Sequence, residues 1–372
     1  MQNTLGLYIH IPFCASKCSY CDFYSFATND NQIIEYKNAL IKEISVWSEK
    51  CKNKVVDTIY FGGGTPSLIG GKNIFDIISC IYDNFNVCEN AEITVECNPD
   101  SINKDLLLWL SKAKVNRLSI GVQAMQDDVL KSLCRRHTAN EAQKAVNLAK
   151  EHGFNNISLD LMYALPNQSV DMVLYSLNKM LALQPKHLSC YALKVEQDTP
   201  LAKQNPVLPD EDISADMYEA ICKTLNKAGF EHYEVSNWAK HGYYSKHNSK
   251  YWDLSEYLGI GPSAHSLFDK KRFEYPSNIN EFISSPKITQ EPEVDGFTDI
   301  DEFIMLSLRT SKGINKNDFE TRFNMLFNPV EKVLKKYEPY KLTKLENGVW
   351  TLTEKGFLVS NAILSDILSS VE

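Results

Sequence analysis

The sequence predicts an α/β fold, a partial (β/α)6 TIM-like barrel followed by a small helical, winged-helix-like domain. Six strand-like segments alternate with helical patterns between residues 5 and 193, which is typical of βαβ units that build a parallel sheet. Beyond residue 299, short helical patterns flank a single hairpin. Barrel proteins carry their sites where the strands end, so the residues that follow each strand are the functional candidates.

The six strand segments are runs rich in β-branched and aromatic residues. They are an apolar stretch just before Cys14 and the segments 55–61, 92–97, 117–123, 156–162 and 187–193. Helices are expected over 32–50 and 210–228, where apolar residues recur at three- and four-residue steps. A further helix begins after Thr138, which forms a capping box with Glu141, and ends at Gly153.

Proline and glycine residues between 284 and 296 indicate a domain boundary, and we expect one domain over 1–285 and another over 286–372. Helical patterns at 301–308, 318–323 and 330–337 precede a hairpin, 341–346 and 349–353, that turns at Asn347-Gly348. Residues 299–372 contain ten Lys and Arg and eleven Asp and Glu, a net charge of −1. This near-neutral charge argues against nucleic-acid binding and favours packing against the barrel mouth.

Composition narrows the protein class further. The net charge of −8 disfavours nonspecific nucleic-acid binding. No window approaches eighteen consecutive apolar residues, and the N-terminus lacks the charged and small-residue features of a secretory signal. We therefore expect a cytoplasmic protein without a transmembrane segment. Its ten cysteines are then expected to be metal ligands and reduced core thiols rather than disulfides.

Cys14, Cys18 and Cys21 form a C-x3-C-x2-C run directly after the first strand. Three thiolates can hold three irons of a 4Fe-4S cluster, which leaves the fourth iron open for a ligand. The alternatives are a zinc site or three unrelated buried thiols. Zinc normally requires a further Cys or His pair at ligand spacing, and the remaining cysteines supply none.

Polar residues and glycines lie at the ends of the next strands. The run 62–66, GGGTP, removes side chains where a backbone can approach a ligand, although such a run taken alone is more often a tight βα turn. Glu96, Gln123, Arg135 and Asp160 are polar groups in apolar or strand-end settings. Singly, each is compatible with a rim salt bridge. Together they offer acceptors for an ammonium and a ribose and a guanidinium for a carboxylate.

The cysteine spacing resembles the signature of the radical S-adenosylmethionine (SAM) superfamily. More narrowly, YIHIPFC-x3-C-x2-C, GGGTP, IGVQ at 120–123, Arg135 and SLDLMYALPNQS at 158–169 look like the anaerobic coproporphyrinogen III oxidase family over essentially the whole chain. The resemblance implies a radical SAM barrel with SAM on the open iron of the cluster. It also implies a SAM site lined by Tyr8, Tyr20, Gly63, Gly64, Thr65, Glu96, Gln123, Arg135, Asp160 and Ala192.

Two departures indicate the branch of that family. The oxidases continue the cluster motif with a fourth cysteine after one more residue, whereas Phe23 follows Asp22 here. They also carry an N-terminal extension ahead of the cluster, whereas Cys14 comes almost at once in this sequence. The CDF sequence at 21–23 and HNSKYW at 247–252 are similar to the HemW heme chaperone branch. His247 would then be a heme ligand, and Tyr251 and Trp252 would provide aromatic surface that covers a porphyrin face. The plainer interpretation is a loop histidine beside two core aromatics.

Three functions remain open on the sequence. The leading interpretation is a heme chaperone that binds heme, carries a 4Fe-4S cluster with SAM at the open iron, and transfers heme to an acceptor protein. The alternative is an oxygen-independent coproporphyrinogen III oxidase, a radical SAM decarboxylase. A third is a regulatory or structural protein that has kept only the scaffold. His241 and His265 are weaker heme-ligand candidates, and His10 is either a residue that supports the cluster ligands or a packing residue.

Overall fold

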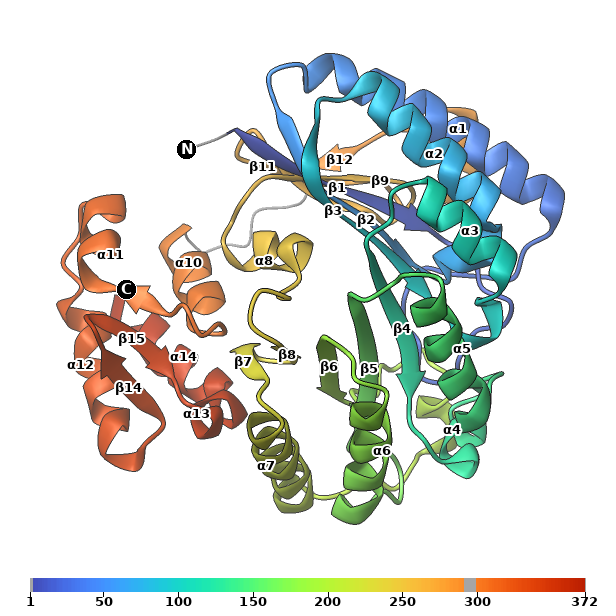
Figure 1. Ribbon diagram of the computed structural model, residues 1–372. Helices are drawn as coiled ribbons and strands as arrows, with labels where there is room; N and C mark the ends of the chain where they lie inside the picture. Colours follow the sequence, from blue (N-terminus) through green and yellow to red (C-terminus); the bar gives the residue numbers. More distant parts are fainter. Residues whose placement is uncertain (1–2, 291–298, 372) are drawn as a thin grey trace.

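The computed structural model describes residues 3–290 and 299–371 and confirms the α/β class (Figure 1). Six parallel strands lie side by side in chain order, with the parallel strand β9 added next to β1. The parallel strands are β1 (Thr4–Ile11), β2 (Val55–Gly63), β3 (Val87–Cys97), β4 (Arg117–Gln123), β5 (Ile157–Tyr163), β6 (His187–Ala192) and β9 (Tyr257–Ile260). All six predicted strands are present.

Antiparallel strands extend the sheet at both edges. Strands β7 (Glu231–Glu234) and β8 (Asn237–Ala239) pair beyond β6. Strands β10 (His265–Phe268), β11 (Lys271–Glu274) and β12 (Thr289–Gln290) continue beyond β9. Within the described residues, β12 and β7 form the two edges, so the sheet is not closed. It curves as an open, partial barrel (Figure 1). The parallel strand β9 was not predicted.

Helices cover the outer face of the curved sheet (Figure 1). They are α1 (Asp30–Lys50), α2 (Gly71–Asn84), α3 (Lys104–Lys112), α4 (Asp127–Ser132), α5 (Ala139–Glu151), α6 (Val170–Ala182) and α7 (Glu211–Lys227). Two short helices, α8 (Lys246–Trp252) and α9 (Ile279–Ser284), follow. The predicted capping box of α5 is present, because Thr138 accepts from the Glu141 backbone and Glu141 reaches back to Thr138.

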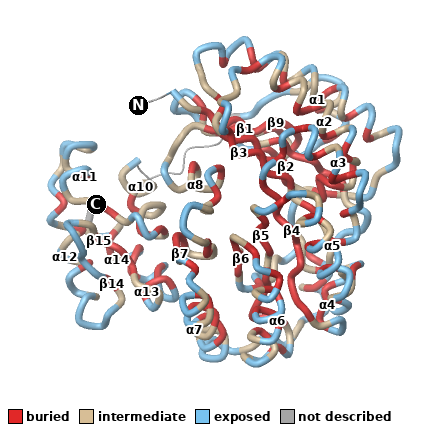
Figure 2. Tube along the Cα trace, in the orientation of Figure 1, coloured by how far each residue is buried: buried red, intermediate tan, exposed pale blue. Residues whose placement is uncertain are grey.

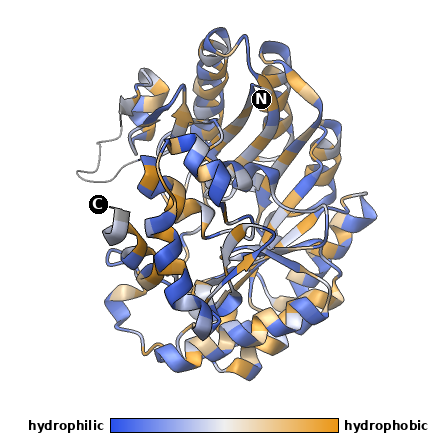
Figure 3. Ribbon diagram, turned by 90° about the vertical axis from the view of Figure 1, so that its left-hand side faces the viewer, coloured by the Kyte–Doolittle hydropathy of each residue, from blue (hydrophilic) through white to orange (hydrophobic). Residues whose placement is uncertain are grey.

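The main hydrophobic core lies between the sheet and the outer helices. Leu5, Leu7, Ile9 and Ile11 of β1 are fully buried and belong to the same core cluster as the inward face of α1. The buried trace follows the strands, whereas the exposed trace follows the outer turns of the helices (Figure 2). Hydrophobic and hydrophilic segments alternate along these helices, as expected for helices with one buried face (Figure 3).

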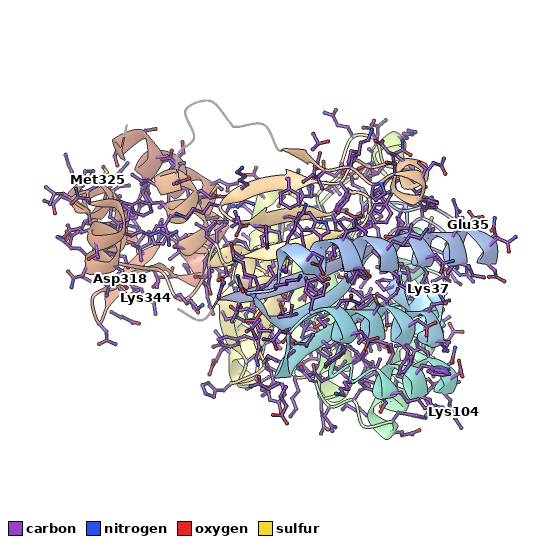
Figure 4. All side chains as sticks on the ribbon, turned by 90° about the horizontal axis from the view of Figure 1, so that it is seen from above. Glu35, Lys37, Lys104, Asp318, Met325 and Lys344 are labelled. Atoms are coloured by element: carbon purple, nitrogen blue, oxygen red, sulfur yellow. The ribbon has the colours of Figure 1, made fainter. Side chains whose placement is uncertain are left out.

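The C-terminal domain has the predicted winged-helix-like order of elements. It contains α10 (Asp299–Ser307), β13 (Ile314–Asn315), α11 (Lys316–Phe323), α12 (Asn328–Tyr337), β14 (Thr343–Glu346), β15 (Val349–Leu352), α13 (Glu354–Leu358) and α14 (Ser360–Val371). Asn347 and Gly348 both have positive φ, 51° and 78°, as a two-residue hairpin turn requires. In Figure 4, Asp318, Met325 and Lys344 of this domain lie on the side of the molecule opposite Glu35.

The sequence predicted that this domain packs against the barrel mouth. The structure places its contacts on α7, β7 and α8 at one edge of the sheet, through a bridge between Glu234 and Thr310 and an ion pair of Lys312 with Asp253. The boundary at residue 285 stays a prediction. Thr289–Gln290 still pair with β11 of the barrel sheet, and Pro292 and Gly296 lie outside the described residues.

No helix in the described ranges combines the length and the apolar character needed to cross a membrane.

Removal of the α5 cap should lower stability without affecting the site. Thr138→Ala loses the side-chain acceptor for the Glu141 backbone and is expected to reduce the free energy of unfolding by about 1 kcal/mol, measured by chemical denaturation. Asn140→Ala, at an exposed position of the same helix, should leave stability within about 0.5 kcal/mol of wild type. Equal effects of both substitutions would contradict the assignment.

Candidate functional site

The cysteine loop is closed at its base by hydrogen bonds next to β1. The backbone of Cys14 donates to the Phe26 carbonyl at 3.0 Å, and Phe26 donates to the Pro12 carbonyl at 3.0 Å. The His10 Nε2 lies 3.1 Å from the Tyr24 carbonyl, while its Nδ1 lies 3.1 Å from the Tyr8 hydroxyl. His10 therefore fixes the loop to the end of β1, which is the supporting position that the sequence left open.

The three cysteines are free, half-buried thiols on this single loop. Cys14 Sγ lies 3.5 Å from Thr65 Oγ1, and Arg135 Nη1 donates to Cys18 Sγ at 3.4 Å. Burial raises the pKa of Cys21, and the charges of Cys18 and Cys14 raise it further. Such mutual repulsion between thiolates is relieved when a cationic metal centre is bound. The donor set therefore fits an iron-sulfur cluster held by three sulfurs.

The arrangement of these sulfurs does not match a single zinc ion. Among the described residues, Cys222, His232 and Glu354 are the one group of three or more His, Cys, Asp or Glu whose ligand atoms all lie within 4.8 Å of one another. At least one pair of the three loop sulfurs is therefore more than 4.8 Å apart. A tetrahedral zinc site would draw its sulfurs to about 3.8 Å, given zinc–sulfur bonds of about 2.3 Å.

The glycine run lies directly beside the cysteine loop. The Gly64 backbone donates to the Ile11 carbonyl at 2.8 Å, and a Cβ on Gly64 would stand 2.6 Å from the Phe13 carbonyl and 3.0 Å from Cys14 Sγ. Gly63 has φ 113°, and a Cβ there would meet the His10 ring at 2.7 Å. These glycines are required because the two loops approach each other too closely for side chains.

Glu96 and Asp160 are half-buried and place two carboxyl groups on the inner side of the sheet. Burial raises the pKa of Glu96 to about 7, although the hydrogen bond from Tyr60, 2.7 Å, opposes the shift. Burial likewise raises the pKa of Asp160 to about 6, with the charge of Arg117 opposing it. Both carboxyls therefore favour partial neutralisation near neutral pH, and both would gain from a cationic ligand.

Arg135 connects the cysteine loop to the ends of two strands. Its Nη2 donates to Asn98 Oδ1 at 2.9 Å and to the Gly121 carbonyl at 2.5 Å, while Asn98 Nδ2 donates to Thr65 Oγ1 at 3.1 Å. Its Nε is buried and makes no hydrogen bond within the described part of the chain. The guanidinium therefore retains a donor for an anionic ligand group.

The other predicted SAM-site residues lie along the same rim. Gln123 ends β4 with φ 69° and accepts from the Tyr191 hydroxyl at 2.8 Å. Tyr20 interacts electrostatically with Arg135 and Cys18, and burial raises its pKa. Tyr8 lies on β1 with its ring stacked at 6.2 Å from that of Tyr60, and Ala192 is exposed at the end of β6. Their role in binding SAM stays a prediction.

His247 lies in a different setting from the one expected of a heme ligand. It is 0% exposed on α8, with Nδ1 2.8 Å from Thr58 Oγ1 and Nε2 2.9 Å from the Tyr251 hydroxyl. Burial lowers its pKa to about 3, so the ring is neutral. Its ring stacks on Tyr60 at 5.1 Å. In this conformation both nitrogens are engaged, and heme ligation by His247 stays a prediction that requires one bond to break.

Sequence reasoning missed three residues that organise the site. Asn98 joins Arg135 to Thr65, and Tyr60 donates to Glu96. Arg117 is 1% exposed and interacts electrostatically with the carboxyls of Glu96 and Asp160. Asn98 could have been found, because it directly follows a strand end at the same rim. Arg117 begins an apolar strand, where a buried charge is itself a signal.

Comparison with known proteins identifies the family. A Radical SAM superfamily model matches residues 8–180, and a HemN C-terminal domain model matches residues 298–359. The heme chaperone HemW of Lactococcus lactis is 33% identical, with 99% of this chain and 98% of that protein covered. The heme chaperone HemW of Escherichia coli K12 is also 33% identical, with 98% of each chain covered. The chain belongs to the HemW heme chaperone family.

The structural comparison agrees with that assignment for the fold. The structure described as coproporphyrinogen III oxidase (HemN) from Escherichia coli, a radical SAM enzyme, has a TM-score of 0.85 and 22% identity, with 98% of this chain and 90% of that chain covered. The radical SAM match implies a 4Fe-4S cluster and SAM as the cofactors of this HemW family member. Cys14, Cys18 and Cys21 would hold the cluster.

A side chain at Gly64, beside Cys14, should prevent cluster assembly. Gly64→Ala places a Cβ against Cys14 Sγ and the Phe13 carbonyl, so we expect a large loss of iron after anaerobic reconstitution, measured by iron content and visible absorption. Gly70→Ala is the matched control. It strains a backbone with φ 83° but meets no atom within 4 Å, and it should lower stability while retaining iron. Full iron content in Gly64→Ala would show that cluster assembly does not depend on the absence of a side chain at Gly64.

The half-buried Glu96 should make stability depend on pH. Its pKa is about 7 in the folded protein against 4.5 ordinarily, so the folded state binds more protons between these values and the free energy of unfolding falls as pH rises through that window. Glu96→Gln should therefore stabilise the cluster-free protein at pH ~8, by up to ~3 kcal/mol, and much less at pH ~5.

Denaturant unfolding at the two pH values measures this difference. Glu151→Gln, which changes an exposed carboxylate on α5, is the control and should leave the pH dependence as in wild type. A Glu96→Gln variant that is destabilised equally at both pH values would show that the charge is not the cause.

Proposed function

We propose that this protein is a heme chaperone, which binds heme and transfers it to an acceptor protein. The observation that carries the proposal is the identity of about one third to heme chaperones over nearly the full length of both chains. Phe23 supports it, because it occupies the position at which the oxidase branch has a further cysteine. Its side chain is 69% exposed on the cluster loop.

The rim residues fit a role in holding SAM at an open iron of the cluster. The Gly63–Thr65 backbone is free of bulky side chains, Glu96 offers an acceptor for an ammonium, and Arg135 retains an unpaired nitrogen for a carboxylate. Gln123 and Asp160 supply polar groups for a ribose. Bound cluster and SAM would supply one-electron chemistry, which the surrounding side chains position and shield from water.

We propose two candidate contacts for heme. The exposed Phe23 ring offers apolar surface to a porphyrin face close to the cluster. His247 is the candidate iron ligand, and it becomes available only if the Tyr251 hydroxyl releases its Nε2. We further propose a cytoplasmic location, since ten free cysteines, among them the three cluster ligands, require a reducing compartment.

Optical titration of the anaerobic, cluster-loaded protein with hemin tests the proposal. We expect saturable binding of heme in the micromolar range or tighter. Phe23→Ser should weaken binding several-fold, because it removes apolar contact area. Leu108→Ser, which changes an exposed apolar residue on α3 outside the site, should not. Absence of saturable binding by the wild type would remove the heme chaperone function.

His247 can be tested in the same titration. His247→Gln should change the absorption and electron paramagnetic resonance signature of the bound ferric heme if the imidazole binds iron. An unchanged signature, together with lowered stability, would show that His247 only packs inside the barrel.

Incubation of the reduced protein with coproporphyrinogen III separates the chaperone from the oxidase. The chaperone should form no divinyl product and should consume no SAM in response to the porphyrinogen. Product formation by the wild type, lost in Cys14→Ala, would overturn the proposal in favour of the oxidase.

A further inference from the structure

A second group of potential metal ligands lies far along the chain from the cysteine loop. Cys222 of α7, His232 of β7 and Glu354 of α13 bring one sulfur, one ring nitrogen and one carboxylate oxygen within 4.8 Å of one another. Two of these residues belong to the barrel edge and one to the C-terminal domain. The packing of α7 against both α13 and β7 brings them together.

The His232 ring is held with one nitrogen unused. Its Nε2 lies 3.4 Å from the Val235 carbonyl, whereas its Nδ1 is buried and makes no hydrogen bond to any described residue. The ring stacks on that of Trp238, with the ring centroids 4.0 Å apart and an interplanar angle of 10°. It makes a T-shaped contact with the ring of Phe357, with the centroids 5.1 Å apart. A histidine that donates through one nitrogen presents a lone pair at the other, which is how metal-binding histidines are commonly oriented.

Cys222 and Glu354 can each supply a further ligand atom. Cys222 is a free thiol that is 2% exposed. Glu354 is the first residue of α13, and its Oε1 accepts from Asn226 Nδ2 at 2.6 Å, which leaves its second oxygen available. A buried, unpaired nitrogen is costly unless a ligand satisfies it. A cation bound by Nδ1 together with the Cys222 and Glu354 groups would do so.

We propose that Cys222, His232 and Glu354 bind a zinc ion that joins the C-terminal domain to the barrel edge. One thiolate, one imidazole and one carboxylate form a mixed donor set that suits zinc, and three protein ligands leave a fourth position open. Bonds of about 2.0–2.3 Å require the three ligand atoms, which lie within 4.8 Å of one another, to approach to about 3.5 Å when the ion binds. This inference does not depend on the heme chaperone function.

The surroundings allow an ion and a fourth ligand to enter. Cavities of about 740 and 700 Å³ flank the group, and Asn226 and Glu354 line both. A water molecule or another small ligand can therefore reach the open position. The ion would reinforce a junction that otherwise includes the Lys355–Glu219 ion pair at 3.5 Å and the backbone bridge of Glu234 with Thr310.

Zinc binding by the full-length, cluster-loaded protein tests the proposal. After anaerobic dialysis against zinc and removal of excess metal, we expect one zinc per chain. Zinc K-edge X-ray absorption should show one sulfur and the remaining ligands as nitrogen or oxygen. Cys222→Ser, His232→Gln and Glu354→Gln should each weaken zinc binding by at least about tenfold, and the zinc-dependent rise in the unfolding temperature should be lost in each.

Two kinds of control separate this site from others. Cys88→Ser and His152→Gln replace the same residue types on β3 and at the end of α5, and they should bind zinc as the wild type does. The Cys14→Ser, Cys18→Ser, Cys21→Ser triple variant should also keep its zinc. Metal-free unfolding of the Glu354→Gln variant, which preserves the Asn226 acceptor, shows whether the variant is folded.

Three outcomes would overturn the proposal. The wild type could bind no zinc, or the three ligand variants could bind it as tightly as the controls. Alternatively, the zinc could be surrounded by three sulfurs and be lost from the triple variant, which would place it on the cysteine loop.

Discussion

The parallel pairing of β1 with β2 determines the whole site. Its register sets His10 opposite Gly62 and Ile11 opposite Gly63, so the cysteine loop and the glycine run leave the sheet side by side. Two backbone hydrogen bonds, Gly64 to Ile11 at 2.8 Å and Thr65 to Phe13 at 2.7 Å, continue the pairing beyond the strands. A shift of one residue would turn the inward side chains to the opposite face and separate the thiols from the glycine cradle.

Buried charge is the second constraint on the inner face. Glu96 and Asp160 are desolvated carboxyls, and Arg117 and Arg135 are the cations near them. Without a ligand, these cations and hydrogen bonds stabilise the charged carboxylates only in part. The raised pKa values of both carboxyls reflect the desolvation cost that remains. A cationic ligand at the rim would reduce that cost, so binding and stability are linked through the same groups.

The sequence predicted the six parallel strands and the shared rim because strand alternation and strand-end position are local patterns. Cys14, Gly64, Thr65 and Arg135 are connected by direct contacts or through Asn98, as expected from that rule. The sequence did not predict β9, whose four residues pair with β1 across more than two hundred positions of the chain. Pairings of that range depend on the tertiary fold, which no local window contains.

The dependence on the tertiary fold also explains why the sequence did not show which of His247 and His232 has a nitrogen available for a ligand. In the sequence, His247 lies in a distinctive aromatic motif and His232 does not. In the structure, both ring nitrogens of His247 interact with hydroxyl groups, those of Thr58 and Tyr251. His232 has a buried Nδ1 without a hydrogen-bond partner among the described residues, and one of its ring nitrogens lies within 4.8 Å of ligand atoms of Cys222 and Glu354. Ligand capacity depends on which hydrogen bonds the fold has already satisfied. That property arises from the contacts of α13 with α7 and β7, from which it is separated by more than a hundred residues.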